Sequence, residues 1–448
     1  MEEPISLSVY GTTEFKGLNT RQKIAFCAAM SGQNIFITGG GGVGKSHLIN
    51  AFERHMRGIV LTAPTGVAAV NIAGQTLDRF MGFNTEYKNV KTVRRMRKDV
   101  RERLERLKVL LIDEVGTARC DKIDLIDARL KAAKKSKEPF GGVQVIFVGD
   151  FCQLKPVLNL KTEEGQLFKQ DYGKRLYAFE SDSWVNANIQ PHVLNEYFRQ
   201  DDEMQKKVLR FLRLGREIPT AVHFVNQMAT GDIRDDALVL CTTNARAHNI
   251  NTNRYAELSG EERIFRCKIE GQFSTRPSAE LIKLKRGARI MLLANTPDKG
   301  FSNGDMGEIV NMSPKSVTVM LDRGFSVEVE TKVWEEFEYV VGPKGLTKEV
   351  SASYEQLPIS LAYAVTIHKC QGLTLDSAVV DLTGGVFAEG QTYVALSRVR
   401  SFKNLKLTKK LLVSDVKFSP LAVSFTEDSS NSAIQRTEID LEKHPQAA

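Results

Sequence analysis

A glycine-rich loop between an apolar strand and a helix constrains this chain more than any other feature. Residues 33–49 read QNIFITGGGGVGKSHLI and match G-x-x-x-x-G-K-[ST] through Gly39, Gly44, Lys45 and Ser46. The apolar run before the loop and the helical pattern after it separate a true match from a chance one. Glycines let backbone N–H groups point at phosphate oxygens, and a helix N-terminus adds partial positive charge. The sequence therefore predicts a phosphate-binding loop rather than a flexible loop without a ligand.

The loop also predicts how a nucleoside triphosphate is held. Lys45 is expected to reach the β- and γ-phosphates, and Ser46 to bind the Mg²⁺ that accompanies them. The predicted loop contacts are Gly39, Gly40, Gly41, Gly42, Val43, Gly44, Lys45, Ser46 and His47.

Bulk composition narrows the class of protein. At 448 residues the chain is too long for one core and suggests roughly two to four domains. We find neither an apolar run long enough to span a bilayer nor a signal pattern in MEEPISLSVYG, and we expect a cytoplasmic protein of bacterial or viral context without a membrane partner. Six cysteines without a C-x-x-C pair indicate reduced thiols. The charge of +8 suits a polyanionic partner but is common among enzymes.

Apolar runs and helical patterns alternate beyond the loop. The runs at residues 58–63, 108–114 and 143–157 are continuous rather than alternating with polar residues. This pattern predicts a parallel sheet covered on both faces, with ligands at the carboxyl ends of its strands.

Polar residues at two of these strand ends are candidates for catalysis. Asp113 is placed to hold the Mg²⁺ shell, and Glu114 to orient and deprotonate an attacking water. An acidic pair that caps the next helix is the alternative, which the upstream loop makes weaker. Gln153 could sense the γ-phosphate or simply stabilise a turn.

Gln22 lies in the helical pattern of residues 18–30, on its expected exposed side. A solvated helix residue is the simpler interpretation of this spacing. A glutamine before a phosphate loop can also clamp an adenine edge, because its amide both donates and accepts hydrogen bonds.

A basic segment interrupts the strand-helix rhythm. Residues 91–108, which we expect to be helical, carry nine basic and three acidic side chains. This composition fits a solvated helix face and a phosphate-backbone contact equally well. Aromatic residues ahead of it could stack on bases, although Phe80 could equally belong to a core. The candidate contacts are Phe80, Phe83, Tyr87, Arg94, Arg95 and Arg97.

A second alternating set begins near residue 191. Short β-branched runs with glycine turns at 303–330 predict a small antiparallel barrel inserted into it. The last 25 residues are polar and acidic, and we expect a weakly ordered tail.

Two arginines of this half, Arg199 and Arg398, could act on the nucleotide; the second is expected on a helix. If each reaches the γ-phosphate only when two domains close, hydrolysis becomes coupled to domain motion. Surface or ion-paired arginines are the alternative.

Seven motifs together resemble the PIF (petite integration frequency) family of superfamily 1B DNA helicases. They occur in the family's order over roughly residues 15–410: GGGGVGKS, APTGVAAVNIAG, LLIDEV, GGVQVIFVGDFCQLKPV, LNEYFRQ, AYAVTIHKCQGLTLD and QTYVALSRVRSFKNL. The last two are the most diagnostic, because simple P-loop ATPases have no counterpart of them.

The resemblance implies an α/β fold with two RecA-like P-loop domains, at residues 1–190 and 191–412. A wedge at 76–107 would be inserted in the first domain and a β-barrel at 300–357 in the second, leaving 413–448 as the tail. The implied activity is ATP-driven 5′ to 3′ translocation on single-stranded DNA, with unwinding of duplexes in replication, repair or recombination.

The implied partners are single-stranded DNA, single/double-strand junctions, and replication or single-strand-binding proteins, with the chain itself a monomer. Rival interpretations are an ATP-gated clamp that unwinds little, and a RecD-like subunit of a nuclease complex.

Individual roles follow from the matched motifs. Gln22 resembles the adenine contact, Lys45 the phosphate ligand, Ser46 and Asp113 the Mg²⁺ ligands, and Glu114 the catalytic base. Gln153, Arg199 and Arg398 resemble the γ-phosphate sensor and two arginine fingers. The positions that match strand contacts are Pro64, Thr65, Gly66, Thr366, His368 and Lys369.

Two departures from the family pattern affect these expectations. Val115-Gly116-Thr117 replaces Ile-Ser-Met after the acidic pair, which leaves the contacts of that turn open. Asp78-Arg79 replaces His-Ser, and an aspartate that faces DNA would repel it.

Overall fold

The computed structural model describes residues 12–83, 90, 93–229, 233, 237–273, 276–343 and 345–443, without the side chains of 297 and 435–443. Tyr87, a candidate stacking residue, lies outside these ranges. The chain forms two compact units. The first unit holds residues 1–196, 336–350 and 420–448, and the second unit holds 197–335 and 351–419. Within the described ranges, no helix combines the length and apolar character that crossing a bilayer requires.

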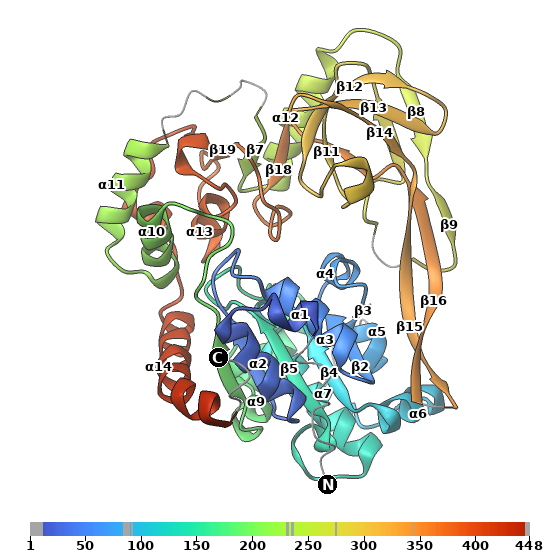
Figure 1. Ribbon diagram of the computed structural model, residues 1–448, viewed down its shortest axis with the longest axis vertical. Helices are drawn as coiled ribbons and strands as arrows, with labels where there is room; N and C mark the ends of the chain where they lie inside the picture. The colour runs from blue at the N-terminus through green and yellow to red at the C-terminus, as the bar shows by residue number, and fades with distance from the viewer. Residues whose placement is uncertain are drawn as a thin grey trace. The chain divides into compact units, whose positions relative to one another are not determined.

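A six-stranded parallel sheet forms the centre of the first unit (Figure 1). Its order is β3-β2-β4-β5-β1-β6. The strands are β1 (Ile35–Thr38), β2 (Ile59–Ala63), β3 (Gln75–Thr76), β4 (Val109–Ile112), β5 (Gln144–Gly149) and β6 (Gln190–Val193). We expected the second domain to begin near residue 191, but β6 pairs with β1, Ile35 opposite Gln190.

Both faces of this sheet are buried, as the continuous apolar runs predicted. Phe36, Leu110 and Phe147 pack on one face in a core shared with α7, while the intervening residues Ile35 and Ile37 are buried as well. The helices of the first unit are α1 (Thr13–Lys16), α2 (Thr20–Met30), α3 (Lys45–His55), α4 (Gly66–Asn71), α5 (Leu77–Met81), α6 (Lys98–Arg106), α7 (Cys120–Lys134), α8 (Glu163–Tyr172), α9 (Asp182–Asn186) and α14 (Pro420–Lys443).

The basic segment is less helical than its sequence predicted. Among the described residues of the segment only α6 is helical, and Arg94, Arg95 and Arg97 precede it. One charged residue of α6, Arg103, stabilises the fold, since it is only 5% exposed. Its guanidinium lies over the ring of Phe80 and donates a hydrogen bond to the Phe80 carbonyl at 2.7 Å.

A long hairpin made of β15 (Lys332–Gly342) and β16 (Gly345–Gln356) completes this region. Its residues 336–350 belong to the first unit. There Glu336 pairs with Arg79 at 2.5 Å, Glu338 pairs with Arg103 at 3.4 Å, and the Tyr339 hydroxyl accepts a hydrogen bond from the backbone N–H of Leu61 at 3.0 Å. The hairpin therefore packs against the segment that we had interpreted as an inserted wedge.

The second unit is built on a parallel sheet of order β18-β7-β19-β20. Its strands are β7 (Val239–Cys241), β18 (Ala364–Thr366), β19 (Ala378–Asp381) and β20 (Leu405–Leu407). Its helices are α10 (Glu203–Leu214), α11 (Ile218–Met228), α12 (Asn244–Ala256) and α13 (Gln391–Leu396).

The insertion in the second unit is larger than the predicted range of 300–357. A five-stranded antiparallel sheet of order β14-β13-β12-β11-β17 shares one apolar core with the β10-β8 pair. These strands are β8 (Arg263–Arg266), β10 (Leu281–Leu284), β11 (Arg289–Leu292), β12 (Met306–Met312), β13 (Ser316–Leu321), β14 (Ser326–Glu330) and β17 (Ile359–Leu361), and β9 (Lys268–Glu270) pairs with β16.

The expectation of a weakly ordered tail is wrong for residues 420–443, which form the helix α14, and residues 444–448 of the predicted tail lie outside the described ranges. The ring of Phe425 stacks on Phe179 at 4.1 Å between centroids and 5° between planes, and Ala422 is fully buried in the core of the first unit. The sulfur of Cys152 lies 3.3 Å from the hydroxyl of Thr426. Apolar contacts on one side of α14 thus order a segment that is polar in its overall composition.

Replacing Phe425 with alanine should lower the free energy of unfolding by about 2–3 kcal/mol, because the ring is partly buried among aromatic side chains. Ile434→Ala on the same helix should change it by less than about 0.5 kcal/mol, since that side chain is 60% exposed. Urea denaturation measures both values. Equal values for the two variants would mean that α14 contributes nothing to the stability of the first unit.

Candidate nucleotide-binding site

The phosphate loop leaves β1 at Thr38 and enters α3 at Lys45, as the sequence predicted. Gly39 is required by a close approach, because a Cβ there would lie 2.3 Å from the carbonyl oxygen of Leu194. Gly44 adopts the left-handed conformation, with φ of 83°, at the start of α3. No side chain caps this helix, and the partial positive charge of its N-terminus favours an anion.

The polar side chains of the loop lie at the surface or half-buried. Lys45 donates to the carbonyls of Gly39 and Gly40 at 2.8 and 3.0 Å. Ser46 and His47 are exposed, whereas Val43 is buried and can offer a ligand only its backbone. Gly40 and Gly41 are buried and Gly42 is half-buried. This donor set fits a triphosphate with its metal: backbone N–H groups and an ammonium for phosphate, and a hydroxyl for Mg²⁺.

Gln22 is 1% exposed, so its predicted place on the exposed side of the helix is wrong. Its amide oxygen accepts from the N–H of Asn19 at 3.0 Å and its amide nitrogen donates to the carbonyl of Gly44 at 3.2 Å. A glutamine at the third position of a capping box is drawn toward the helix start, which explains the burial. Gln22 thereby connects α2 with the phosphate loop.

The acidic pair follows β4 directly. Asp113 continues the sheet, since its N–H donates to the carbonyl of Thr62 at 2.9 Å. Burial and the charge of Glu114 raise the pKa of Asp113 to about 7, and the positive charge of Lys45 opposes this rise. Lys45 and Asp113 therefore lie within electrostatic range of each other, and a cation bound there would favour the ionised carboxylate.

The turn after the acidic pair explains one departure from the family pattern. Glu114 adopts the left-handed conformation, with φ of 51°, and Val115 is fully buried. A Cβ on Gly116 would lie 2.8 Å from the carbonyl oxygen of Asp150. Glycine at this position lets the turn after β4 approach the end of β5.

Gln153 lies in the turn after β5 and is 7% exposed. Its amide donates to the carboxylate of Asp150 at 3.1 Å, and its N–H donates to the carbonyl of the same residue at 3.2 Å. The turn-stabilising interpretation is confirmed, and the γ-phosphate sensor stays a prediction.

Arg199 and Arg398, 199 residues apart in sequence, meet in the second unit around Ser397. Arg199 donates to the Ser397 carbonyl at 3.0 Å and to the hydroxyl of Thr374 at 2.9 Å. Arg398 donates to the Ser397 hydroxyl at 2.7 Å and to the Val394 carbonyl at 2.8 Å. We expected Arg398 on a helix, but α13 ends at Leu396.

The two guanidinium groups differ in access. Arg398 is 1% exposed and Arg199 is half-buried. Burial and the charge of Arg398 lower the pKa of Arg199 to about 9. Within the part of the chain that the structure describes, neither arginine pairs with a carboxylate. Two like charges without a counter-ion make a suitable site for a polyanion. Thr374 and Ser397, which hold the pair, were missed as site residues although both lie in motifs quoted above.

The positions matched to strand contacts differ in exposure. Thr65 is exposed at the start of α4, where its hydroxyl accepts from the N–H of Ala68 at 3.3 Å, and Pro64 and Gly66 are half-buried. His368 and Lys369 are exposed after β18, whereas Thr366 is 5% exposed and its side chain is a poor candidate for a direct contact.

Phe80 and Phe83, the aromatic candidates that the structure describes, do not present free faces. Phe80 is fully buried, so its prediction as a stacking residue is wrong and its core alternative is confirmed. Phe83 is half-buried, and the guanidinium of Arg129 and the ammonium of Lys122 lie over its ring at 4.8 and 5.5 Å. Lys122 also pairs with Asp78 at 3.0 Å, which neutralises the aspartate expected to repel DNA.

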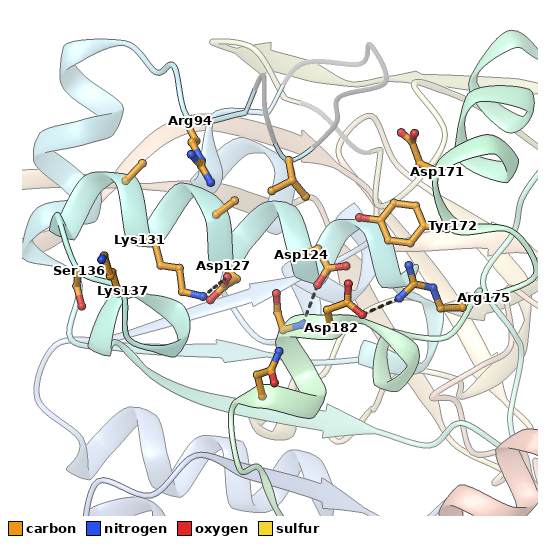
Figure 2. A pocket seen from close by; sticks show the side chains of 15 residues that line it. Arg94, Asp124, Asp127, Lys131, Ser136, Lys137, Asp171, Tyr172, Arg175 and Asp182 are labelled. Carbon is orange, nitrogen blue, oxygen red and sulfur yellow. Dashed lines mark hydrogen bonds and ion pairs between the residues drawn. The ribbon is translucent and has the colours of Figure 1, made fainter.

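Arg94, Arg95 and Arg97 are exposed, as a phosphate contact requires. Arg94 also lines a cavity of about 870 Å³ along α7 (Figure 2). There Lys131 pairs with Asp127 and Arg175 with Asp182, each at 2.8 Å. No residue of the phosphate loop lines this cavity, so it is separate from the nucleotide site.

Comparisons with known proteins agree with this geometry. The family model described as PIF1-like helicase matches residues 17–236. The ATP-dependent DNA helicase Pif1 of Bdellovibrio bacteriovorus is 34% identical over 403 residues, covering 87% of each chain. The human ATP-dependent DNA helicase PIF1 is 32% identical over 91% of this chain, which spans 62% of the human protein.

Solved structures of Pif1 helicases are also similar to this chain. The Pif1 of a Bacteroides species in complex with ADP-AlF4 superposes with a TM-score of 0.84 and 28% identity, covering 92% of this chain and 97% of that one. A Bacteroides Pif1 bound to single-stranded DNA gives a TM-score of 0.63 at 27% identity, covering 94% of this chain and 97% of that one. On the sequence identity and coverage of these relatives, the chain belongs to the PIF1-like helicase family.

Proposed function

We propose that this chain is an ATP-dependent DNA helicase that translocates along single-stranded DNA and unwinds duplexes. The observation that carries the proposal is the paired chemistry of the two units. The first unit brings a phosphate loop into electrostatic range of the Asp113 carboxylate, and the second holds two arginines that pair with no carboxylate among the described residues. An ATPase that couples hydrolysis to motion between domains needs both sets.

Each functional residue of the first unit has its own proposed role in ATP hydrolysis. Lys45 and the N–H groups of the loop bind the phosphates, and Ser46 and Asp113 would hold Mg²⁺. Bound Mg²⁺ would supply positive charge that offsets the negative charge of the phosphates. Glu114 orients the attacking water and accepts its proton. Gln22 contacts the adenine in this proposal, and Gln153 senses the γ-phosphate.

Arg199 and Arg398 stabilise the negative charge that develops on the transferred phosphoryl group. Arg199, the more accessible of the two, is assigned the direct contact. Arg398 acts beside it through the shared Ser397.

The DNA contacts are proposed on exposure and chemistry. Thr65, His368 and Lys369 would hold the strand, and the arginines before α6 would add phosphate contacts. Single/double-strand junctions are the proposed substrate, and the proposed translocation runs 5′ to 3′. We propose that the chain acts as a monomer in the cytoplasm, where its partners are replication or single-strand-binding proteins. The polarity rests on family resemblance. Among the similar solved structures, a Bacteroides Pif1 is bound to single-stranded DNA, and another structure concerns DNA unwinding at forked duplex DNA by two coordinating Pif1 helicases.

Strand displacement tests the function and its polarity together. With ATP and Mg²⁺, the protein should unwind a partial duplex that carries a 5′ single-stranded overhang and leave a 3′ overhang duplex paired. The readout is release of a fluorescent strand, with omission of ATP as the control. Unwinding of only the 3′ substrate would reverse the polarity, and DNA-stimulated ATP hydrolysis without any displacement would favour a clamp.

Glu114→Gln should reduce DNA-stimulated ATP hydrolysis by about 10²-fold or more, because the variant keeps the side-chain shape and loses the base. Binding of a fluorescent ATP analogue should persist, since the phosphate ligands remain. Glu105→Gln, at an exposed position of α6, is the matched control and should hydrolyse ATP normally. Normal hydrolysis by Glu114→Gln would remove Glu114 from the mechanism.

Arg199→Ala should lower the rate of DNA-stimulated hydrolysis by about 10³-fold if the side chain stabilises the transition state. Affinity for a single-stranded oligonucleotide should stay near the wild-type value, which anisotropy measures. Arg400→Ala removes an exposed arginine from the same region as a control for charge. If the two variants lost activity equally, the effect would come from the overall positive charge of the second unit and not from a direct contact of Arg199 with the phosphoryl group.

A further inference from the structure

Phe387 is an exposed aromatic residue on a well-anchored loop of the second unit. Its side chain is 60% exposed, whereas its neighbours Val386 and Ala388 are 7% and 8% exposed. Its N–H donates to the amide oxygen of Gln391 at 3.2 Å, and Gln391, which is fully buried, donates in turn to the carbonyl of Thr242 at 3.3 Å. The loop is therefore held in place while its aromatic ring points to the surface.

A second exposed ring lies beside it. The planes of Phe387 and His368 are within 11° of parallel, and their centroids are 6.1 Å apart. Since the two rings share an orientation, a planar group that stacks on one of them also lies parallel to the other. Lys369, the next residue, is exposed and supplies a positive charge next to the pair.

The sheet topology brings the two rings to one edge. β18 and β19 flank β7, and their last residues Thr366 and Asp381 both pair with Cys241. The loops that carry His368 and Phe387 leave from these two strand ends. Ligands of parallel α/β sheets bind outside the carboxyl ends of the strands, so the ring pair occupies a typical ligand position.

We propose that Phe387 and His368 form a base-stacking subsite for one unpaired nucleobase of the single strand. This inference rests on the proposed function. The family resemblance gave residues that contact the DNA strand, and the ring pair adds a contact to a nucleobase. Stacking on an aromatic face tolerates every base, which suits a motor that must move along any sequence.

Phe325 shows what distinguishes this site from an ordinary exposed ring. It is 42% exposed in the turn between β13 and β14, but the guanidinium of Arg323 lies over its ring at 5.4 Å. Phe325→Ala is therefore a matched control that removes an exposed ring from the same unit.

The test uses oligothymidine strands with a single abasic site moved one nucleotide at a time, and fluorescence anisotropy as the readout. Wild-type protein should bind about 5- to 100-fold more weakly when the abasic site occupies the subsite. Phe387→Ala should bind the intact strand more weakly than the wild type by a similar factor. On the strand whose abasic site occupies the subsite, Phe387→Ala and the wild type should bind with equal affinity. Phe387→Tyr should restore the wild-type pattern, and Phe325→Ala should keep it.

Two results would overturn the subsite: equal affinities of the wild type and Phe387→Ala for the intact strand, or an equal loss by Phe387→Ala on intact and abasic strands. If Phe387→Ala fails to fold by circular dichroism, Phe387→Leu keeps an apolar side chain without an aromatic face and is expected to show the same loss. A wild-type protein that binds no oligonucleotide would instead contradict the proposed function itself.

Discussion

The close approach of backbone segments at the carboxyl edge of the first sheet is the constraint on which the nucleotide site depends. A Cβ at Gly39 would lie 2.3 Å from the Leu194 carbonyl oxygen, and one at Gly116 would lie 2.8 Å from that of Asp150. Any larger residue at either position would separate neighbouring strand ends. Because the strands stay close, Lys45 comes within electrostatic range of Asp113 although the two follow different strands. The positions of the site's side chains thus depend on the close packing of the backbone at this edge.

The second unit uses a similar sheet edge for different chemistry. Its arginines are held by carbonyls and hydroxyls near Ser397, and no carboxylate of the described residues pairs with them. That arrangement costs stability, which is visible in the lowered pKa of Arg199. A polyanionic ligand would offset the cost. Two arginines held by neutral groups and an exposed aromatic pair suit a unit that acts on phosphates and bases of a bound ligand. The first unit instead carries both the phosphate loop and the acidic pair.

Local sequence patterns predicted β1, α3 and β4 because strand, loop and helix signals there agree with one another over short distances. They failed where contacts between distant residues decide the outcome. The order of α14 depends on Phe425 stacking on Phe179, and the long hairpin is anchored by a hydrogen bond between Tyr339 and Leu61, 278 residues apart. Gln22 was misplaced because its capping box with Asn19 turns the amide inward, a signal that was present in the sequence and not used. The meeting of Arg199 and Arg398 followed from no local pattern.

Phe80 and Phe387 show why the role of an aromatic residue is difficult to predict from sequence. Phe80 lies beside a basic segment, which suggested base stacking, yet the ring is enclosed by Arg103 on one side and Tyr339 on another. Phe387 lies in a stretch without such a charge run, yet its ring is exposed and parallel to His368. Nearby charge therefore did not predict which ring is accessible. Accessibility was decided by what packs against each ring, and Arg103, a member of the same basic segment that suggested a DNA contact, is one of the residues that cover Phe80.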